Sequence, residues 1–225
     1  MLVIYYSRIL RGYFPIGYTR EMLKMKKSMN FQNVTLAQCG GDVANLPEIH
    51  FYRANEKPYG AFSNLYRRPI VFDGREYPTS EHAYQAGKAA KESVREWILS
   101  APSPSLVAMA AHGLYKWDIV PGWSKVKFDR MRAVLRIKFS QHQDLQELLL
   151  STGDARLVES ARTDNAVNRL WGEVNGKGKN MLGILLMELR SELQLESKQF
   201  TVKTEVKKEL SSKTFATTNV IEPVC

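Results

Sequence analysis

The chain has 225 residues, of which 44% are hydrophobic, enough for one sizeable core but too few for two full domains. Its formal net charge of +9 would favour a nucleic-acid-binding protein if the charge lay in the folded part. Lys and Arg outnumber Asp and Glu by six to two in residues 1–45 and by five to three in residues 197–225, leaving 21 against 18 between these ends. The basic character is therefore mostly a property of the ends and says little about what the middle of the chain binds.

Cysteine and histidine positions argue against a disulfide scaffold and a structural metal. Cys39 and Cys225 lie near opposite ends of the chain, and none of the four histidines has a His or Cys partner at ligand spacing. No apolar run approaches the roughly 18 residues of a membrane span. Residues 1–20 contain arginines and no acid, a weak organellar-targeting signal interrupted by Pro and Gly. We expect a cytoplasmic protein with no metal or cofactor.

The central part of the sequence predicts mainly helices with a few short strands, an α+β domain. Residues 49–53 and 69–77 are strand-like, the second turning at Asp73-Gly74. Helical signals follow at residues 79–91, 93–100, 105–113, 125–140, 144–151 and 181–195. We therefore place one compact domain at residues 46–196, after a weakly structured extension (1–45) that ends in a polar linker (28–46). A flexible, disordered tail (197–225), rich in Lys, Thr and Ser, is expected after it.

The longest of the helices inside this domain predicts a buried face and a basic outer face. Its apolar residues follow helical spacing, and its basic residues lie elsewhere on the helical wheel. The apolar set is Phe128, Met131, Val134, Leu135 and Phe139, and the basic set is Arg130, Arg132, Arg136 and Lys138.

The helix that follows Pro78 carries the first candidate site. Glu81, Tyr84, Gln85 and Lys88 are spaced i, i+3, i+4 and i+7, which places them on one face of a helix. Alanines occupy the opposite side, so the polar row could simply face solvent. An aromatic and an amide between an acid and a base nevertheless favour the wall of a binding site.

A glycine- and lysine-rich segment before the last helix is the second candidate site. It runs from Trp171 to Asn180, with Gly172, Lys177, Gly178 and Lys179 inside it. Backbone N–H groups at glycines, lysine charges and a helix N-terminus together suit a phosphate group. An ordinary surface turn is the alternative.

Two single residues add weaker signals. Trp123 precedes a predicted helix and could stack on a flat base or cover the core. Asp164 lies in a polar stretch that could equally be a turn.

Taken together, these motifs resemble the YbiA-like family, also called NADAR. The resemblance covers about residues 49 to 195 in the expected order, which is far more specific than any one motif. The matching segments are His50–Tyr52, Tyr59–Asn64, Pro78–Lys88, Trp123–Lys127, Gly176–Gly183 and Leu186–Arg190.

The resemblance implies an N-glycosidase that hydrolyses the bond between ribose and a nitrogen base in a phosphorylated nucleoside-like substrate. Members are associated with riboflavin-pathway ribosylamino-pyrimidine phosphates or with ADP-ribose attached to guanine, including guanine in nucleic acid. By this resemblance, the family's catalytic positions correspond to Glu81, Lys88, Trp123 and Asp164 in this sequence. This chain departs from the family pattern at Glu173, where Asp is common after Trp-Gly, a difference that bears on the identity of the substrate more than on the reaction.

For this reaction the sequence suggests a distribution of roles. Glu81 would stabilise positive charge on the sugar and activate water. Lys88 could neutralise phosphate or attack the opened sugar as an amine, and the sequence does not choose. The remaining predicted substrate-binding residues are Phe62, Ser63, Asn64, Tyr84, Gln85, Trp171, Gly172, Lys177, Gly178, Lys179 and Asn180.

Two other classes of function remain open from the sequence. One is a module that binds ADP-ribose or NAD without turnover. The other is a nucleic-acid-binding protein that uses the basic helix around Arg132 and the basic flanks.

Overall fold

The computed structural model describes residues 47–216, with side chains to residue 199. The predicted N-terminal extension and linker, both cysteines and residues 217–225 lie outside the described residues. The elements in chain order are β1 (Glu48–Phe51), η4 (Tyr59–Phe62), β2 (Ile70–Phe72), β3 (Arg75–Tyr77), α3 (Ser80–Ala86), α4 (Glu92–Leu99), α5 (Pro104–His112), η5 (Lys116–Asp118), α6 (Trp123–Gln141), α7 (Gln143–Leu150), β4 (Arg156–Glu159), α8 (Ala166–Trp171), β5 (Glu173–Val174), β6 (Lys177–Gly178) and α9 (Met181–Ala216).

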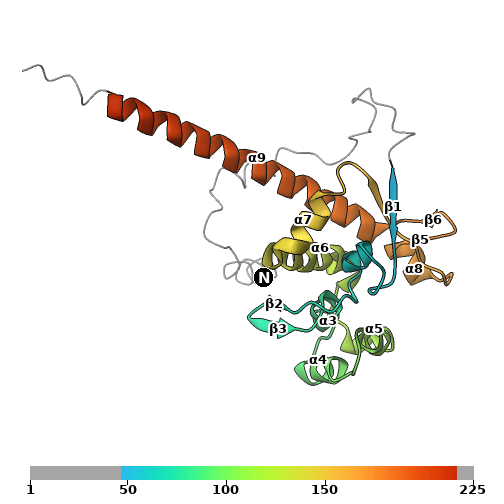
Figure 1. Cartoon of the computed structure of the whole chain (residues 1–225). Coiled ribbons are helices and arrows are strands. Elements are labelled where there is room, and N and C mark those ends of the chain that lie inside the picture. Colours follow the sequence, from blue (N-terminus) through green and yellow to red (C-terminus); the bar gives the residue numbers. More distant parts are fainter. Residues whose placement is uncertain (1–46, 217–225) are drawn as a thin grey trace, which may run out of the picture. The chain divides into compact units, whose positions relative to one another are not determined.

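Helices dominate, and the strands form short pairs (Figure 1). β2 and β3 form the antiparallel hairpin predicted around Asp73-Gly74, both of which adopt the positive φ that such a turn requires. β1 and β4 pair in parallel although they lie far apart in sequence, and β5 and β6 form a second hairpin. The predicted fold class, mainly helical with a few short strands, is confirmed.

The main core lies where α6, α7 and the first half of α9 meet β1, β4 and η4. Its members are apolar side chains at helical spacing on α6 and α9, together with the aromatic residues of β1 and η4. The largest fully buried ones include Phe51, Phe62, Met131, Leu135, Phe139, Leu157, Leu182 and Leu185.

The C-terminal helix is longer than the sequence suggested. We expected regular structure to end near Leu195 and a disordered tail from Ser197, but α9 continues to Ala216. In Figure 1 its second half extends away from the other described elements. Elongating a helix costs much less free energy than nucleating one, so the packed first half can serve as the nucleus for the rest.

The outer face of α6 is less basic than its sequence indicated. Lys138 is fully buried, and its Nζ donates hydrogen bonds to the backbone oxygens of Ala61 and Ser63. Burial lowers the pKa of Lys138 to about 7. The lysine was expected outside because helical spacing alone does not reveal the two carbonyl groups that solvate it.

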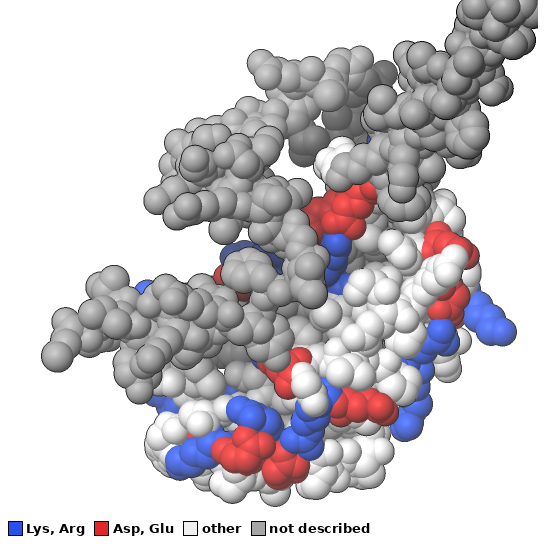
Figure 2. All heavy atoms as spheres, turned by 90° about the vertical axis from the view of Figure 1, so that its left-hand side faces the viewer, with Lys and Arg blue, Asp and Glu red and all other residues white. Residues whose placement is uncertain are grey.

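The arginines of α6 are paired with acids. Arg132 bridges Asp129 and Glu188 at 2.9 and 3.0 Å, and Arg136 pairs with glutamates further along α9. Figure 2 shows Lys and Arg intermixed with Asp and Glu on one face of the protein rather than gathered in a basic patch. Because a phosphate-binding surface needs uncompensated positive charge, these pairs weigh against the predicted nucleic-acid surface around Arg132.

None of the helices within residues 47–216 is both long enough and apolar enough to span a membrane.

Candidate active site

A cavity of about 590 Å³ lies among α3, α5, α6, α8 and the end of β4. Its volume is in the usual range for small-molecule sites. The structure brings many of the predicted site residues to its wall. These are Ser63, Asn64, Glu81, Tyr84, Gln85, Lys88, Trp123 and Trp171.

Glu81 is positioned by the start of α3. Thr79 caps this helix by accepting a hydrogen bond from the backbone N–H of His82, and the Glu81 N–H donates to the Asn64 carbonyl at 3.0 Å. The Glu81 carboxylate accepts a hydrogen bond from Gln85 Nε2 at 2.7 Å, and the residue is only 8% exposed. A buried carboxylate is therefore held at the cavity wall by its own helix.

The electrostatics of Glu81 favour a carboxyl group that titrates near neutral pH. Burial raises the pKa of Glu81 to about 7, against the opposing effects of the Gln85 hydrogen bond and the Lys88 charge. A general base works best when its pKa lies near the working pH. The residue thus has the environment of a catalytic carboxyl group.

Aromatic rings form one side of the cavity. Tyr84 lies between Trp123 and Trp171, with ring centroids 5.3 Å and 5.6 Å apart. Burial, and next the charge of Glu81, raise the pKa of the Tyr84 hydroxyl, so it stays neutral. Such rings suit a flat base beside a sugar.

The segment after η4 contributes Ser63, Asn64 and Leu65 to the cavity wall. The buried Lys138 holds the carbonyls of Ala61 and Ser63, which fixes the chain just before Asn64. No described residue donates a hydrogen bond to Asn64 Oδ1 or to Gln85 Oε1. Both oxygen atoms are buried, so a ligand hydroxyl group would reach them only after a side-chain rotation.

Lys88 reaches the cavity from a turn and not from the predicted helix. We expected that helix to run to about residue 91, but α3 ends at Ala86 with Gly87 as its C-cap. Gly87 lies against the side chain of Arg130, so a Cβ atom there would require that side chain to shift. The Lys88 ammonium donates to the Ala111 carbonyl at 2.5 Å. Burial lowers the pKa of Lys88, and the charge of Glu81 opposes that shift.

Apart from Trp171, the glycine- and lysine-rich segment does not line the cavity. Lys177 and Gly178 form β6, and Asn175 and Gly176 make the positive-φ turn of the hairpin. The N–H groups expected to hold phosphate already have partners, because that of Lys179 donates to Arg169 and that of Asn180 to Gly172.

Glycine is required in this hairpin for packing. A Cβ atom on Gly172 would lie 2.2 Å from the Glu159 carbonyl oxygen, and one on Gly178 would strike the Gly172 carbonyl. The predicted contributions of Gly172, Lys177, Gly178, Lys179 and Asn180 to phosphate binding in this cavity therefore find no support in the geometry.

Two further predicted residues lie elsewhere. Phe62 has no exposed surface and packs between Phe51, Tyr59 and Phe139, so it is a core residue that cannot stack on a ligand. Asp164 is exposed and forms an ion pair with Arg169, which lowers the pKa of Asp164. It is not among the residues of the cavity wall.

A second hollow, of about 670 Å³, lies beside β1, β4 and the β5–β6 turn. Two of its acids, Glu48 and Glu173, are both paired with Arg156. Carboxylates paired with an arginine are less suited to proton transfer than the buried Glu81, which has no cationic partner in an ion pair among the described residues.

Several cavity residues were not identified from the sequence. Glu159 ends β4, while Arg53, His112 and Lys127 bring positive charge or a titratable ring to the wall. Glu159 follows the apolar pair Leu157-Val158, a weak strand signal that was missed because the run is so short. The cations come from separate elements that share no sequence motif.

Comparison with known proteins gives the family of this chain. The NADAR domain model matches residues 50–194. The N-glycosidase YbiA of Shigella flexneri is 46% identical over 149 residues, which is 66% of this chain and 89% of that protein. The chain belongs to the NADAR family.

A solved structure and a more distant relative support the same family assignment. The NMR structure of the Escherichia coli protein YbiA matches with a TM-score of 0.61 at 43% identity, covering 68% of this chain and 88% of that one. The riboflavin biosynthesis protein VVA0006 of Vibrio vulnificus is 33% identical over 72% of this chain and 43% of its own length.

The names of these NADAR relatives confirm the predicted reaction class, hydrolysis of an N-glycosyl bond by an enzyme acting on a small ribosyl substrate. Within the described part of the chain, no group of three or more His, Cys, Asp and Glu side chains could hold a metal ion.

Proposed function

We propose that this enzyme hydrolyses the bond between ribose and a nitrogen base in a small phosphorylated ribosyl compound, with Glu81 as its catalytic carboxylate. The observation that carries the proposal is a buried glutamate at the wall of an aromatic cavity, held by Gln85 at 2.7 Å. Riboflavin-pathway ribosylamino-pyrimidine phosphates are the preferred substrate class, because a riboflavin biosynthesis protein is among the relatives.

Glu81 acts on the sugar. Breaking a ribosyl–nitrogen bond leaves positive charge on the anomeric carbon and the ring oxygen, and a nearby carboxylate stabilises this charge. The same carboxylate accepts a proton from the attacking water. The hydrogen bond from Gln85 keeps the Glu81 side chain in one orientation, so Glu81 needs little reorganisation during the reaction.

The aromatic wall binds the base. The ring centroids of Trp123 and Trp171 lie 5.3 Å and 5.6 Å from that of Tyr84. Stacking orients a flat base without demanding one hydrogen-bonding pattern. Asn64 and Ser63 lie on the wall beside Glu81 and would contact the ribose hydroxyls.

Cations at the wall replace the lysines of the hairpin as phosphate ligands. Lys127 is half-buried on α6. Burial is the main cause of the lowered pKa of Lys88, and the Lys127 charge adds to it, so the two ammonium groups lie near each other. Arg53 also lines the cavity. A phosphate there would gain charge-assisted hydrogen bonds from all three side chains.

Lys88 has two possible chemical roles at this site. As an ammonium ion it pairs with phosphate, and as an amine it attacks the opened sugar to form a Schiff base. Burial favours the neutral amine by lowering the pKa of Lys88, whereas the charge of Glu81 favours the ammonium ion.

The deciding experiment is incubation of the protein with ribosylamino-pyrimidine phosphates and, separately, with ADP-ribosylated guanosine, followed by mass spectrometry of the released base. Release by the wild type and loss of release in Glu81→Gln would support the proposal. Tight binding of either compound without release of a base would instead identify a binding module that does not turn over its ligand.

A further inference from the structure

The cavity contains a second carboxyl group, that of Glu159. This residue ends β4, where Phe51 of β1 is its partner in the parallel pair. Glu159 is half-buried, and it shares the cavity wall with Glu81 although 78 positions separate them in the sequence.

The backbone of Glu159 is fixed from two sides. Asn180, at the start of α9, accepts a hydrogen bond from the Glu159 N–H at 3.1 Å, and its Nδ2 donates to the Leu157 carbonyl at 2.7 Å. Gly172 packs so closely on the Glu159 carbonyl that any side chain would clash. The carboxyl group therefore projects from a rigid support, which a catalytic group needs.

No described residue neutralises this carboxyl group. Neither a hydrogen bond nor an ion pair to the Glu159 side chain is present among residues 47–199, whereas Glu48 and Glu173 on the neighbouring strands share Arg156. The Glu81 carboxylate, which lines the same cavity, already has Gln85 as a donor. The other titratable side chains of the wall are Tyr52, Arg53, Tyr84, Lys88, His112 and Lys127.

These surroundings divide the roles of the two acids. Burial, and next the negative charge of Glu81, raise the pKa of Glu159 to about 7. Two desolvated carboxyl groups that line one cavity resist double ionisation, so they share a proton near neutral pH. The Gln85 hydrogen bond and the Lys88 charge favour ionised Glu81, which leaves the proton on Glu159.

We infer that Glu159 is the general acid that protonates the departing base, an assignment that rests on the proposed function. The bond between the anomeric carbon and the base nitrogen breaks, its electron pair stays on nitrogen, and nitrogen takes the proton of Glu159. The water oxygen bonds to the carbon and gives its proton to Glu81. Transfer of that proton back to Glu159 restores the enzyme.

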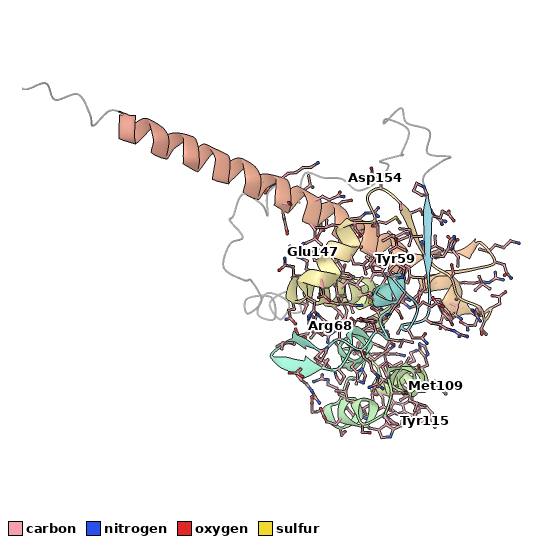
Figure 3. All side chains as sticks on the ribbon, viewed as in Figure 1. Tyr59, Arg68, Met109, Tyr115, Glu147 and Asp154 are labelled. Atoms are coloured by element: carbon pink, nitrogen blue, oxygen red, sulfur yellow. The ribbon has the colours of Figure 1, made fainter. Side chains whose placement is uncertain are left out.

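The test compares two leaving groups in the full-length protein. A ribosylamino-pyrimidine phosphate needs a proton on its departing nitrogen, whereas p-nitrophenyl riboside phosphate releases a stable anion that needs none. Glu159→Gln should lower kcat for the first compound by at least about 100-fold and for the second by less than about tenfold. Glu147→Gln, an exposed position on α7, is the matched control (Figure 3).

The pH profile gives a second readout that a merely structural role would not change. Wild-type kcat should fall above about pH 7 as the general acid loses its proton, and Glu159→Gln should lack this alkaline fall. The acidic limb of the kcat profile, which reports ionisation of Glu81, should move to lower pH in the variant because Glu81 no longer has a second carboxyl group beside it.

The outcomes separate this inference from the proposed function. An active wild type with equal losses on both compounds, or with an unchanged alkaline limb in Glu159→Gln, would overturn the role of Glu159 alone. Retained turnover of p-nitrophenyl riboside phosphate would show that the variant is folded. A wild type that releases product from neither compound would overturn the proposed function and this assignment with it.

Discussion

Replacing Glu81 by glutamine should stabilise the folded protein at about pH 8 while removing turnover. The amide keeps the shape of the side chain and an oxygen that accepts the hydrogen bond from Gln85. It removes a negative charge that the cavity solvates poorly. Activity and stability should therefore change in opposite directions, as is common when a functional group is held in an unfavourable environment.

The magnitude follows from the pKa of Glu81. Folding raises this pKa from 4.5 to about 7, and at about 1.4 kcal/mol per pKa unit this corresponds to about 3 kcal/mol. Because the folded-state value is the higher one, the folded protein binds more protons than the unfolded chain between these two values. The free energy of unfolding of the wild type therefore falls as pH rises through this window, and the loss is complete above about pH 7.

The assay is urea unfolding of the wild type and Glu81→Gln at about pH 5 and about pH 8. The variant should differ little from the wild type at about pH 5 and be more stable by about 3 kcal/mol at about pH 8. Glu147→Gln, which alters an exposed acid, should show no such pH dependence. A stability difference that stays constant between the two pH values would refute the reasoning that burial raises this pKa.

Three further predictions concern phosphate binding, the chemistry of Lys88 and the bounds of the folded domain. Lys127→Ala should weaken binding of phosphorylated ligands, measured by calorimetry, about tenfold more than binding of their dephosphorylated forms. Lys179→Ala on the hairpin should show no such difference. If the two variants behave equally, phosphate does not bind at Lys127. If Lys88 acts as an amine, borohydride added during turnover should leave a ribosyl adduct on Lys88 that peptide mapping detects, and Lys88→Arg should be inactive. An active arginine variant without any adduct would show that Lys88 contributes only its positive charge. A chain of residues 46–196 should keep its fold and activity by circular dichroism and kinetics, since the sequence places the core within it; unfolding would show that the chain outside these residues contributes to the core.

Local features of the sequence determined most of the secondary structure. Helical spacing located α6 and the first half of α9, and Asp73-Gly74 located the β2–β3 turn, because these depend on neighbouring residues. The separated motifs also gave the family and placed Glu81 and Trp123 at a site, since their order along the chain is specific even when their contacts are unknown.

Contacts between distant residues decided the rest. Only the packing of Gly172 against Glu159 shows that this glycine serves close packing, and only burial against two carbonyls shows that Lys138 lies inside. The parallel pairing of β1 with β4 brings Glu159 into the cavity of Glu81. A sequence records which groups can ionise, but the desolvation and neighbouring charge that set their pKa arise from tertiary structure.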